Sequence, residues 1–297
     1  MWNAAWAKAP RPVDDGAPLW SSLATHLDDA ARIAGRLWDE WVGSGLHRLV
    51  EKDVGNSART VALAAAALHD IGKLTRAFSA QEPSMRAHME KAGFGYLSRA
   101  SPADARVLPH SLAGHVIVRD WLVQQGVPER HAAAFATIVG SHHGTFPSMA
   151  VVQEAGRRRS LFGDDEWDTA RHELLARVVA DHGLAGLVDT LREHRLSDAT
   201  QVALAGFVIA ADWIASNSDL FPLSPAFAAP RAAGPVRAEL AWHDLALPAA
   251  WAPTDECLTA SATELLRARF PHASAFAARP VQELAVRAAR TMAEPGL

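Results

Sequence analysis

Histidine and aspartate side chains interrupt the apolar segments of this chain. The interruptions are His69-Asp70, after the apolar residues 61–68; His142-His143, after residues 138–140; and Asp212, after the apolar residues 202–211. An imidazole or a carboxylate among apolar neighbours is costly unless something pairs with it. Because all of these side chains are metal ligands, we interpret the interruptions as parts of one shared metal site.

Each of these residues, taken alone, also has an ordinary structural explanation. A histidine at a helix end can bond to its neighbour or complement the helix dipole, and a buried aspartate can bond to the backbone. Taken together they favour a metal centre, because helical bundles hold inward-facing ligands rigidly. The candidate ligands are His26, His69, Asp70, His110, His142, His143 and Asp212.

Seven ligands are more than one ion uses once water is included, so we expect two ions. Asp70 is the natural bridging carboxylate. Imidazole and carboxylate together suit Mn, Fe, Co or Ni as well as Zn, and we expect the first four ahead of Zn or Mg. Two ions about 3.5–4 Å apart recur in phosphate-ester hydrolysis, where they activate water and neutralise phosphoryl charge. We therefore predict a catalytic role for Asp70.

Lys73 follows in the segment His-Asp-Ile-Gly-Lys of residues 69–73. One interpretation places its ammonium beside the scissile phosphate or behind the metal ligands, and Lys73 then joins Asp70 as a catalytic residue. The other interpretation is a solvated surface lysine.

The elements that must position these residues are helices. Apolar residues recur at spacings of three and four, and no convincing strand alternation is present, so the predicted fold class is all-α. The expected helices are 23–41, 57–70, 110–125, 128–139, 166–180, 184–195 and 197–216. The expected organisation is an irregular segment at 1–20, a catalytic domain at 21–220, a Pro/Ala-rich loop segment at 221–257 and a helical linker at 258–297, with helices at 258–270 and 280–293.

The composition is that of a soluble globular protein. The chain has 297 residues, 49% hydrophobic and 21% charged residues and a net charge of -4. With Cys257 as the single cysteine, an intrachain disulfide and a thiolate zinc site are excluded. The longest apolar stretch, residues 202–211, is shorter than the roughly 20 residues of a membrane span. Because no secretory signal opens the sequence, we expect a cytoplasmic protein without membrane contact.

The order of these residues resembles the HD-domain metal-dependent phosphohydrolase superfamily. The segments that carry the closer resemblance are residues 69–73, 140–144 and 210–217, with 26–31 and 108–114 in support. They look like the HD nuclease domain of the CRISPR-associated nuclease-helicase of type I systems. The resemblance covers roughly residues 6–297 and implies an HD-domain helical bundle with a dinuclear metal site in its core.

The resemblance also implies how the ligands are shared. One ion would be held by His26, His69, Asp70 and Asp212, and the other by Asp70, His110, His142 and His143. His115 is a rival of His110 as the middle ligand, although the residues around His110 match the family better. Ser216 and Asn217 would support the site or contact phosphate.

The implied activity is metal-dependent hydrolysis of single-stranded DNA in CRISPR interference, an antiviral defence. The implied partners are an RNA-guided surveillance complex, which opens the R-loop, and a helicase domain in cis or in trans. Residues 279–289 resemble the lead-in to that helicase domain, but the sequence contains no Gly-x-x-x-x-Gly-Lys-Ser/Thr loop. We therefore expect no ATPase or helicase activity from this chain alone.

Two other functions are compatible with the sequence. An HD-type nucleotide or cyclic-dinucleotide phosphohydrolase would use the same chemistry on a different substrate. A non-catalytic regulatory module would use the metal ions only to hold its fold. The products released, and the effect of removing Asp70, distinguish these alternatives from a nuclease.

Overall fold

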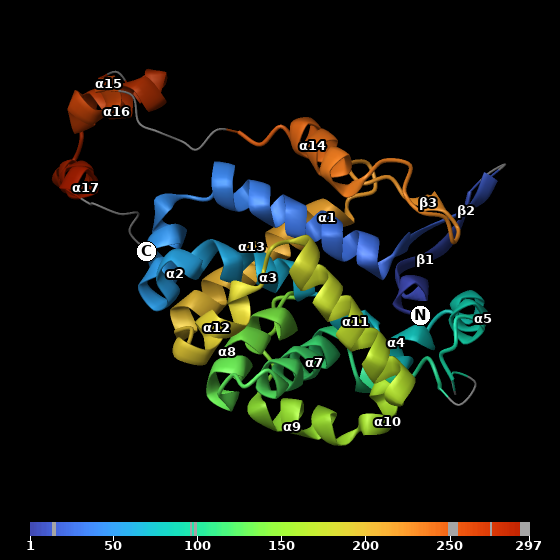
Figure 1. Ribbon diagram of the computed structural model, residues 1–297. Coiled ribbons are helices and arrows are strands. Elements are labelled where there is room, and N and C mark those ends of the chain that lie inside the picture. The colour runs from blue at the N-terminus through green and yellow to red at the C-terminus, as the bar shows by residue number, and fades with distance from the viewer. Residues whose placement is uncertain (14–15, 96, 98–99, 249–254, 274, 292–297) are drawn as a thin grey trace. The chain divides into compact units, whose positions relative to one another are not determined.

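The computed structural model describes residues 1–13, 16–95, 97, 100–248, 255–273 and 275–291. Contacts divide the chain into two compact units: Met1–Val42 with Leu46–Ala246, and Gly43–Gly45 with Leu247–Leu297. The first unit is a bundle of helices with one small sheet (Figure 1). Among its described residues, the second contains the helices α15 (Asp255–Thr259), α16 (Ala262–Arg269) and α17 (Pro280–Thr291).

The helices of the first unit confirm the all-α expectation for the core. They are α1 (Leu23–Arg36), α2 (Ser44–Val54), α3 (Ala58–Leu68), α4 (Arg76–Ser79), α5 (Pro83–Lys91), α6 (Asp104–Val107), α7 (His110–Gln124), α8 (Glu129–Gly140), α9 (Met149–Arg157), α10 (Arg159–Phe162), α11 (Asp165–Asp181), α12 (Gly186–Glu193), α13 (Asp198–Ser216) and α14 (Gly234–Leu245). A π-helical turn, Leu37–Trp41, continues α1.

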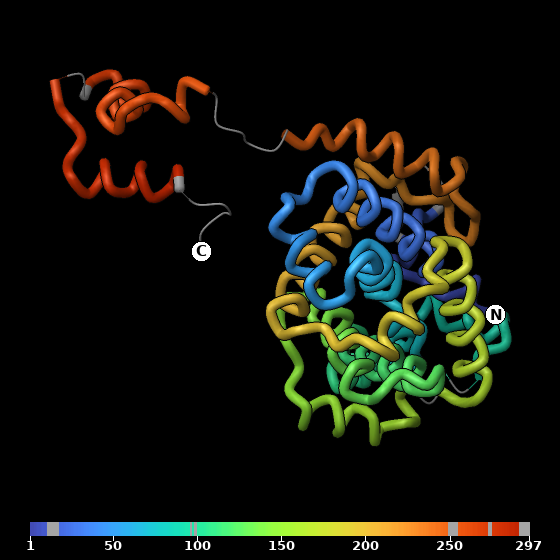
Figure 2. The backbone as a smooth tube through the Cα atoms, turned by 60° about the vertical axis from the view of Figure 1, so that its left-hand side comes forward, coloured from blue at the N-terminus to red at the C-terminus, as the bar shows by residue number. Residues whose placement is uncertain are grey.

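Helix α3 lies in the middle of the first unit, where other helices surround it (Figure 2). Helices α1, α8, α11, α12 and α13 all pack against it. Most of its residues are alanines, and all of its positions from Val61 to Leu68 are buried. Small side chains let neighbouring backbones approach closely. The helix therefore gathers the other elements around the point where it ends, at His69.

Gly72 allows another close contact between backbones. Here the 3₁₀ turn Ile71–Lys73 packs against the beginning of α7. A Cβ atom added at Gly72 would lie 1.9 Å from the carbonyl oxygen of His110 and 2.5 Å from the backbone nitrogen of Gly114. Both atoms belong to the backbone and cannot rotate away. Only glycine therefore lets the turn after Asp70 pack directly on the beginning of α7.

Replacing Gly72 by alanine is expected to lower the free energy of unfolding by about 3 kcal/mol or more, because overpacking against backbone has no cheap relaxation. Urea denaturation measures this change. Gly206 is the matched control, because it is an exposed helix-interior glycine with nothing within 4 Å of an added Cβ. Its replacement by alanine should stabilise the protein by up to about 1 kcal/mol through helix propensity. Equal stability of the two variants would contradict the role of Gly72.

Helix α13 begins where the sequence places it, with the Ser197 hydroxyl accepting a hydrogen bond from the Thr200 backbone nitrogen. Among the described residues it is the one helix long and apolar enough to cross a membrane. Leu204, Val208 and Ala211 are nevertheless buried inside the bundle. We conclude that α13 is a core helix.

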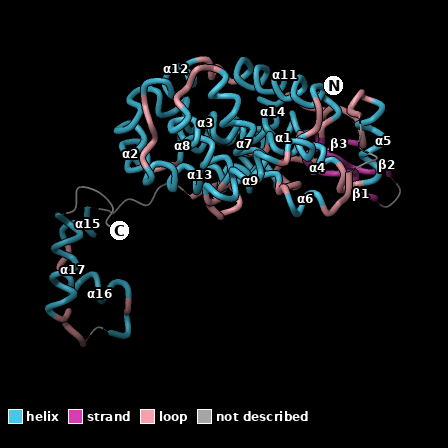
Figure 3. The backbone as a smooth tube through the Cα atoms, turned by 90° about the horizontal axis from the view of Figure 1, so that it is seen from below, coloured by secondary structure: helices cyan, strands magenta, loops and turns pink. Residues whose placement is uncertain are grey.

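The N-terminal segment differs from the sequence expectation. Instead of being irregular throughout, it contains the strands β1 (Trp6–Val13) and β2 (Gly16–Ser22), which pair antiparallel, and β2 also pairs with β3 (Ser224–Pro225). Figure 3 shows this sheet in magenta among the helices. The prolines conceal the pattern, but an edge strand tolerates proline.

Several of the described helices lie where the sequence predicted none: α2, α4, α5, α6, α9, α10 and α14. Helix α2 begins at Ser44 and includes Gly45, although we had interpreted Gly43 and Gly45 only as the end of the preceding helix. Helix α14 lies inside the segment 221–257 that was expected to be loop, and Pro235 occupies its first turn, where proline is favoured. The expected helix at 258–270 corresponds to α16, which begins at Ala262, and the expected helix at 280–293 corresponds to α17. Residues 292 and 293 of that prediction lie outside the described residues.

Candidate metal centre

The candidate ligands come from the ends and inner faces of five helices. His26 lies in the first turn of α1, and Asp212 lies near the end of α13. His69 and Asp70 follow α3 directly, and His110 is the first residue of α7. His142 and His143 follow the end of α8. Helix packing thus collects ligands that lie up to 186 residues apart in the sequence.

The first donor group consists of His26, His69, Asp70 and Asp212, whose ligand atoms all lie within 4.8 Å of one another. His26 Nε2 lies 3.2 Å from both Asp70 Oδ2 and Asp212 Oδ1. His69 Nε2 lies 3.5 Å and 3.3 Å from the same two oxygens. Two nitrogens and two oxygens therefore alternate around a common centre, which is the donor arrangement of a metal site.

The second donor group consists of His110, His142 and His143. The other oxygen of the Asp70 carboxylate faces this group: Asp70 Oδ1 lies 3.3 Å from His110 Nε2 and 3.5 Å from His142 Nε2. His143 Nε2 lies 2.9 Å from His110 Nε2. Asp70 is thus placed between the two groups with one oxygen toward each, which is the arrangement of a bridging carboxylate.

The structure places His110, and not His115, in the second group. His115 lies one turn further along α7, with its ring packed against Gly140, where an added Cβ would come within 2.9 Å of His115 Cβ. Its side chain is buried and neither ring nitrogen has a hydrogen-bond partner. Burial lowers the pKa of His115 to about 4. His115 is therefore a neutral packing residue.

Backbone carbonyl groups orient two of the histidines. The Nδ1 atom of His69 lies 2.7 Å from the carbonyl oxygen of Ala66, and the Nδ1 atom of His142 lies 2.7 Å from that of Val139. An Nδ1–H that donates to a carbonyl leaves the Nε2 lone pair free for a metal. We did not predict these two contacts, although a histidine just after a helix can reach the carbonyl three residues earlier.

The donor set fits a divalent transition-metal ion. Four of its buried atoms make no hydrogen bond: His26 Nε2, His69 Nε2, His142 Nε2 and Asp70 Oδ1. Such atoms are rare in protein interiors without a reason. Ligands bound at about 2.0–2.2 Å in tetrahedral or octahedral geometry are about 3–3.5 Å apart, and the nitrogen–oxygen distances given above lie in this range.

The charges of the first group also favour a cation. Burial alone would lower the pKa of His69, but the carboxylates of Asp70 and Asp212 outweigh burial and raise it to about 10. Burial opposes the charge of Asp70, yet Lys73 and His69 hold its pKa well below the usual range. Both carboxylates remain charged. The group therefore attracts positive charge, either as a proton on His69 or as a metal ion.

Lys73 is not a solvated surface residue. Its Nζ atom lies 2.5 Å from Asp70 Oδ2 and 3.5 Å from the carbonyl oxygen of Ala7, and 14% of its side chain is exposed. The ammonium thus contacts the carboxylate that faces both groups. This position agrees with a role behind the ligands or beside a bound phosphate.

The two candidate supporting residues differ in their contacts. The hydroxyl of Ser216 donates a hydrogen bond of 3.0 Å to Asp212 Oδ1, so Ser216 orients that carboxylate. The side chain of Asn217 accepts a hydrogen bond from the backbone nitrogen of Asp219. Asn217 is exposed at the end of α13, and its described contact closes a local turn.

A helical bundle in which His and Asp donors converge in this way defines the HD class of metal-dependent phosphohydrolases. The family model for the HD domain of Cas3 matches residues 6–221. The chain therefore belongs to the Cas3 HD-domain family. This membership supports a metal-dependent nuclease role in CRISPR systems and confirms the resemblance found in the sequence.

Two curated Cas3 proteins are similar to this chain in sequence. The CRISPR-associated nuclease/helicase Cas3 of Streptococcus thermophilus is 28% identical over 246 residues, which are 73% of this chain and 25% of that protein. The CRISPR-associated endonuclease/helicase Cas3 of Thermus thermophilus is 30% identical over 224 residues, 74% of this chain and 22% of that protein. The chain thus spans about a quarter of the length of the curated relatives it matches.

Solved structures agree with this assignment. A crystal structure of a CRISPR-associated protein matches with a TM-score of 0.69 and 27% identity, covering 92% of this chain and 29% of that chain. The Thermus thermophilus Cas3 HD domain, crystallised in the presence of Ni²⁺, matches with a TM-score of 0.54 and 27% identity. That match covers 82% of this chain and 90% of the other.

Proposed function

We propose that this chain is a two-metal nuclease that hydrolyses phosphodiester bonds of single-stranded DNA. The observation that supports the proposal most directly is the position of Asp70. Its Oδ2 faces the first donor group and its Oδ1 faces the second. A single carboxylate between two groups of donors suits a pair of ions that share one ligand.

A bound pair of ions would supply Lewis-acid stabilisation of phosphoryl charge and would lower the pKa of water. The residues of the chain perform the supporting tasks. Asp70 would hold both donor groups in register, and Ser216 would orient Asp212. The Lys73 ammonium, paired with Asp70 and partly exposed, would attract a phosphate to the site. No serine or cysteine nucleophile is required.

The exposure of the second group supports a polymeric substrate. His26, His69 and Asp70 are buried, whereas His143 is exposed and 22% of the His110 side chain is accessible. Solvent reaches the second group from the side of His143, and we propose that a strand enters from this side. A flexible single strand bends its phosphates into such an opening more readily than a stiff duplex does. This geometry favours single-stranded DNA.

The cellular setting follows from the relatives. Their names describe nuclease-helicases of CRISPR systems, and we propose that the domain works with a helicase, in cis or in trans, and with an RNA-guided surveillance complex in the cytoplasm. The ions proposed are two of Mn, Fe, Co or Ni. Without a phosphate-binding loop in its sequence, the chain itself is proposed to contribute cleavage and no ATP-driven unwinding.

A substrate comparison tests the proposal. The metal-loaded protein is incubated with a single-stranded oligonucleotide, the matching duplex, deoxynucleoside triphosphates and a cyclic dinucleotide. We expect the single strand to be cut into fragments and the duplex to be cleaved more slowly. The nucleotides should be hydrolysed little. Rapid hydrolysis of the nucleotides with an intact single strand would favour the alternative function, an HD-type nucleotide or cyclic-dinucleotide phosphohydrolase.

Metal binding to the first group should release a proton. Because the pKa of His69 is raised to about 10, this histidine carries a proton between pH 6 and 9 that an ion must displace. The affinity of the first group should therefore fall about tenfold for each unit that the pH decreases. Calorimetric titration in buffers of different ionisation enthalpy measures the protons released.

The second group is the internal control. Burial lowers the pKa of His110 to about 3 and also lowers the pKa of His143. His110 is therefore neutral between pH 6 and 9 and loses no proton to an ion, and the lowered pKa of His143 acts in the same direction. A pH-independent affinity at the first group would contradict the position of His69 among its ligands.

A further inference from the structure

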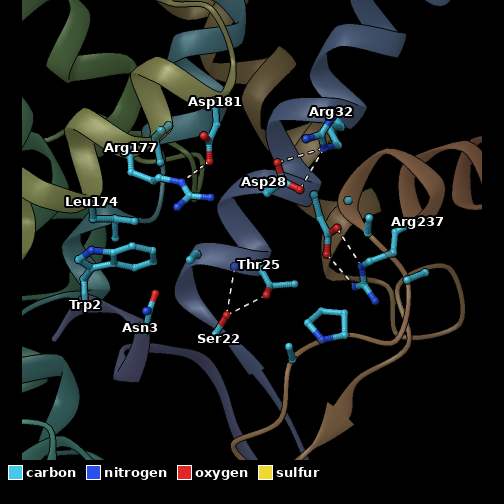
Figure 4. A pocket seen from close by; sticks show the side chains of 18 of the residues that line it. Trp2, Asn3, Ser22, Thr25, Asp28, Arg32, Leu174, Arg177, Asp181 and Arg237 are labelled. Atoms are coloured by element: carbon cyan, nitrogen blue, oxygen red, sulfur yellow. Dashed lines mark hydrogen bonds and ion pairs between the residues drawn. The ribbon is translucent and has the colours of Figure 1, made fainter.

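Helix α14 is connected to α1 through a buried ion pair. Arg237, from the first turn of α14, donates to both oxygens of Asp29: its Nε lies 3.1 Å from Asp29 Oδ1 and its Nη2 lies 2.8 Å from Asp29 Oδ2. The side chains are 11% and 3% exposed. A bidentate pair of this kind fixes orientation as well as distance. Figure 4 shows Arg237 at the wall of a pocket that α1 also lines.

The same guanidinium reaches the segment that follows α13. Arg237 Nη1 donates to the carbonyl oxygen of Pro222, and its guanidinium lies 5.5 Å from the ring centroid of Phe221. Phe221 is buried, and its backbone nitrogen donates to the carbonyl oxygen of Asn217 at the end of α13. One side chain therefore contacts α1 and the chain just beyond α13.

These two helices carry half of the first donor group. Asp29 lies one helical turn after His26 on α1, and the segment that Arg237 contacts follows Asp212 and Ser216 on α13. His26 Nε2 and Asp212 Oδ1 are 3.2 Å apart. A small rotation or slide of either helix would change this distance. The second donor group comes from α7 and α8, whose residues make no described contact with Arg237.

We propose that Arg237 is a positioning residue for the first metal-binding group, holding α1 and the end of α13 at the spacing that His26 and Asp212 require. The inference rests on the proposed metal centre. Arg237 lies beyond residues 6–221, the part of the chain that the family model matches. The positioning device is therefore supplied by the segment that follows the matched domain.

The burial of Asp29 makes the contact important. Burial raises the pKa of Asp29, and Arg237 is the largest influence that opposes this rise. Truncating one partner of a buried pair leaves the other charge uncompensated in a low-dielectric environment. A carboxylate in that situation draws in water or turns toward solvent, and either response moves the helix that carries His26.

The test is a Co²⁺ titration of the full chain in an H143A background, which weakens the second group so that the first dominates the signal. The variants are R237Q, R237K and R32Q, followed by calorimetry and visible absorption. Arg32 is the matched control. Its ion pair with Asp28 joins two residues of α1 that lie one turn apart, so the pair does not connect α1 to another helix. Thermal unfolding without metal is measured in parallel.

For R237Q we expect Co²⁺ affinity to fall about 10–100-fold, the usual effect of losing a residue behind a metal ligand, with a changed absorption spectrum. R237K keeps the charge but not the bidentate geometry, so its affinity and spectrum should be intermediate. R32Q should bind as the parent does. Parent-like affinity and spectrum in R237Q would overturn the inference. If R237Q does not fold, R237K decides in the same way.

Different results would show that the proposed metal centre is wrong and that the role of Arg237 is wrong. If the parent H143A protein binds no Co²⁺ and H26A changes nothing, the metal centre itself is wrong. If the parent binds Co²⁺, H26A abolishes that binding and R237Q leaves it unchanged, only the role of Arg237 is wrong.

Discussion

Replacing Asp70 by asparagine should abolish cleavage of single-stranded DNA while the helical fold persists. Asparagine keeps the shape of the side chain but removes the charge that faces both donor groups. Shared ion binding is worth several kcal/mol in the transition state, and each 1.36 kcal/mol is a factor of ten in rate. We therefore expect a loss of about a thousandfold or more. A gel assay of strand cleavage, with circular dichroism on the same sample, measures both effects.

Asp39 provides the control for this substitution. Its carboxylate forms an exposed ion pair with Arg59, 2.6 Å long, and makes no described contact with the candidate metal ligands. An asparagine at position 39 should leave cleavage unchanged and cost at most about 1 kcal/mol of stability. If D70N retained full activity, the bridging role would be wrong. If D70N unfolded in the presence of metal, the site would be mainly structural, as in the alternative of a regulatory module.

Removal of metal by EDTA should abolish activity and lower the melting temperature. Each ion that binds the native state at a hundred times its dissociation constant adds about 2.7 kcal/mol. Two such ions correspond to a melting temperature higher by roughly 10 °C for a domain of this size. Returning Mn²⁺, Co²⁺ or Ni²⁺ should restore both properties, and Mg²⁺, which prefers oxygen ligands, should restore less.

A double substitution provides the control for chelation. The variant H69A/D212N lacks one histidine and one carboxylate of the first donor group and should show a smaller melting shift on adding metal than the native protein. Elemental analysis of both proteins gives the ion count directly. Full activity in EDTA, or identical melting shifts in the two proteins, would contradict a metal centre at these residues.

The sequence allowed the helices with strong periodicity to be predicted, because their apolar spacing and their caps agree. Helix α13 is an example: Ser197 caps it, and its buried face matches the apolar pattern. The candidate ligands were recognisable because they do not fit the apolar pattern. Asp70 and Asp212 break an apolar pattern where no packing argument would place them.

The elements that were missed depend on interactions between distant segments. Strand β1 contains prolines at positions 10 and 12, which obscure its alternation, and it is stabilised by pairing with β2. Helix α14 is anchored by Arg237 to Asp29, a contact across 208 residues that no local pattern encodes. The family resemblance favoured His110 over His115, and the coordinates agree, because His110 lies 3.3 Å from Asp70 Oδ1 whereas His115 packs against Gly140.

The alanine-rich helix α3 limits how this domain can change over evolution. Its interior positions accept no additional volume, because the helices that carry His26, Asp212 and the paired histidines lie directly against it. A single added methyl group there would act as a wedge, altering ligand spacing from a distance without touching any ligand.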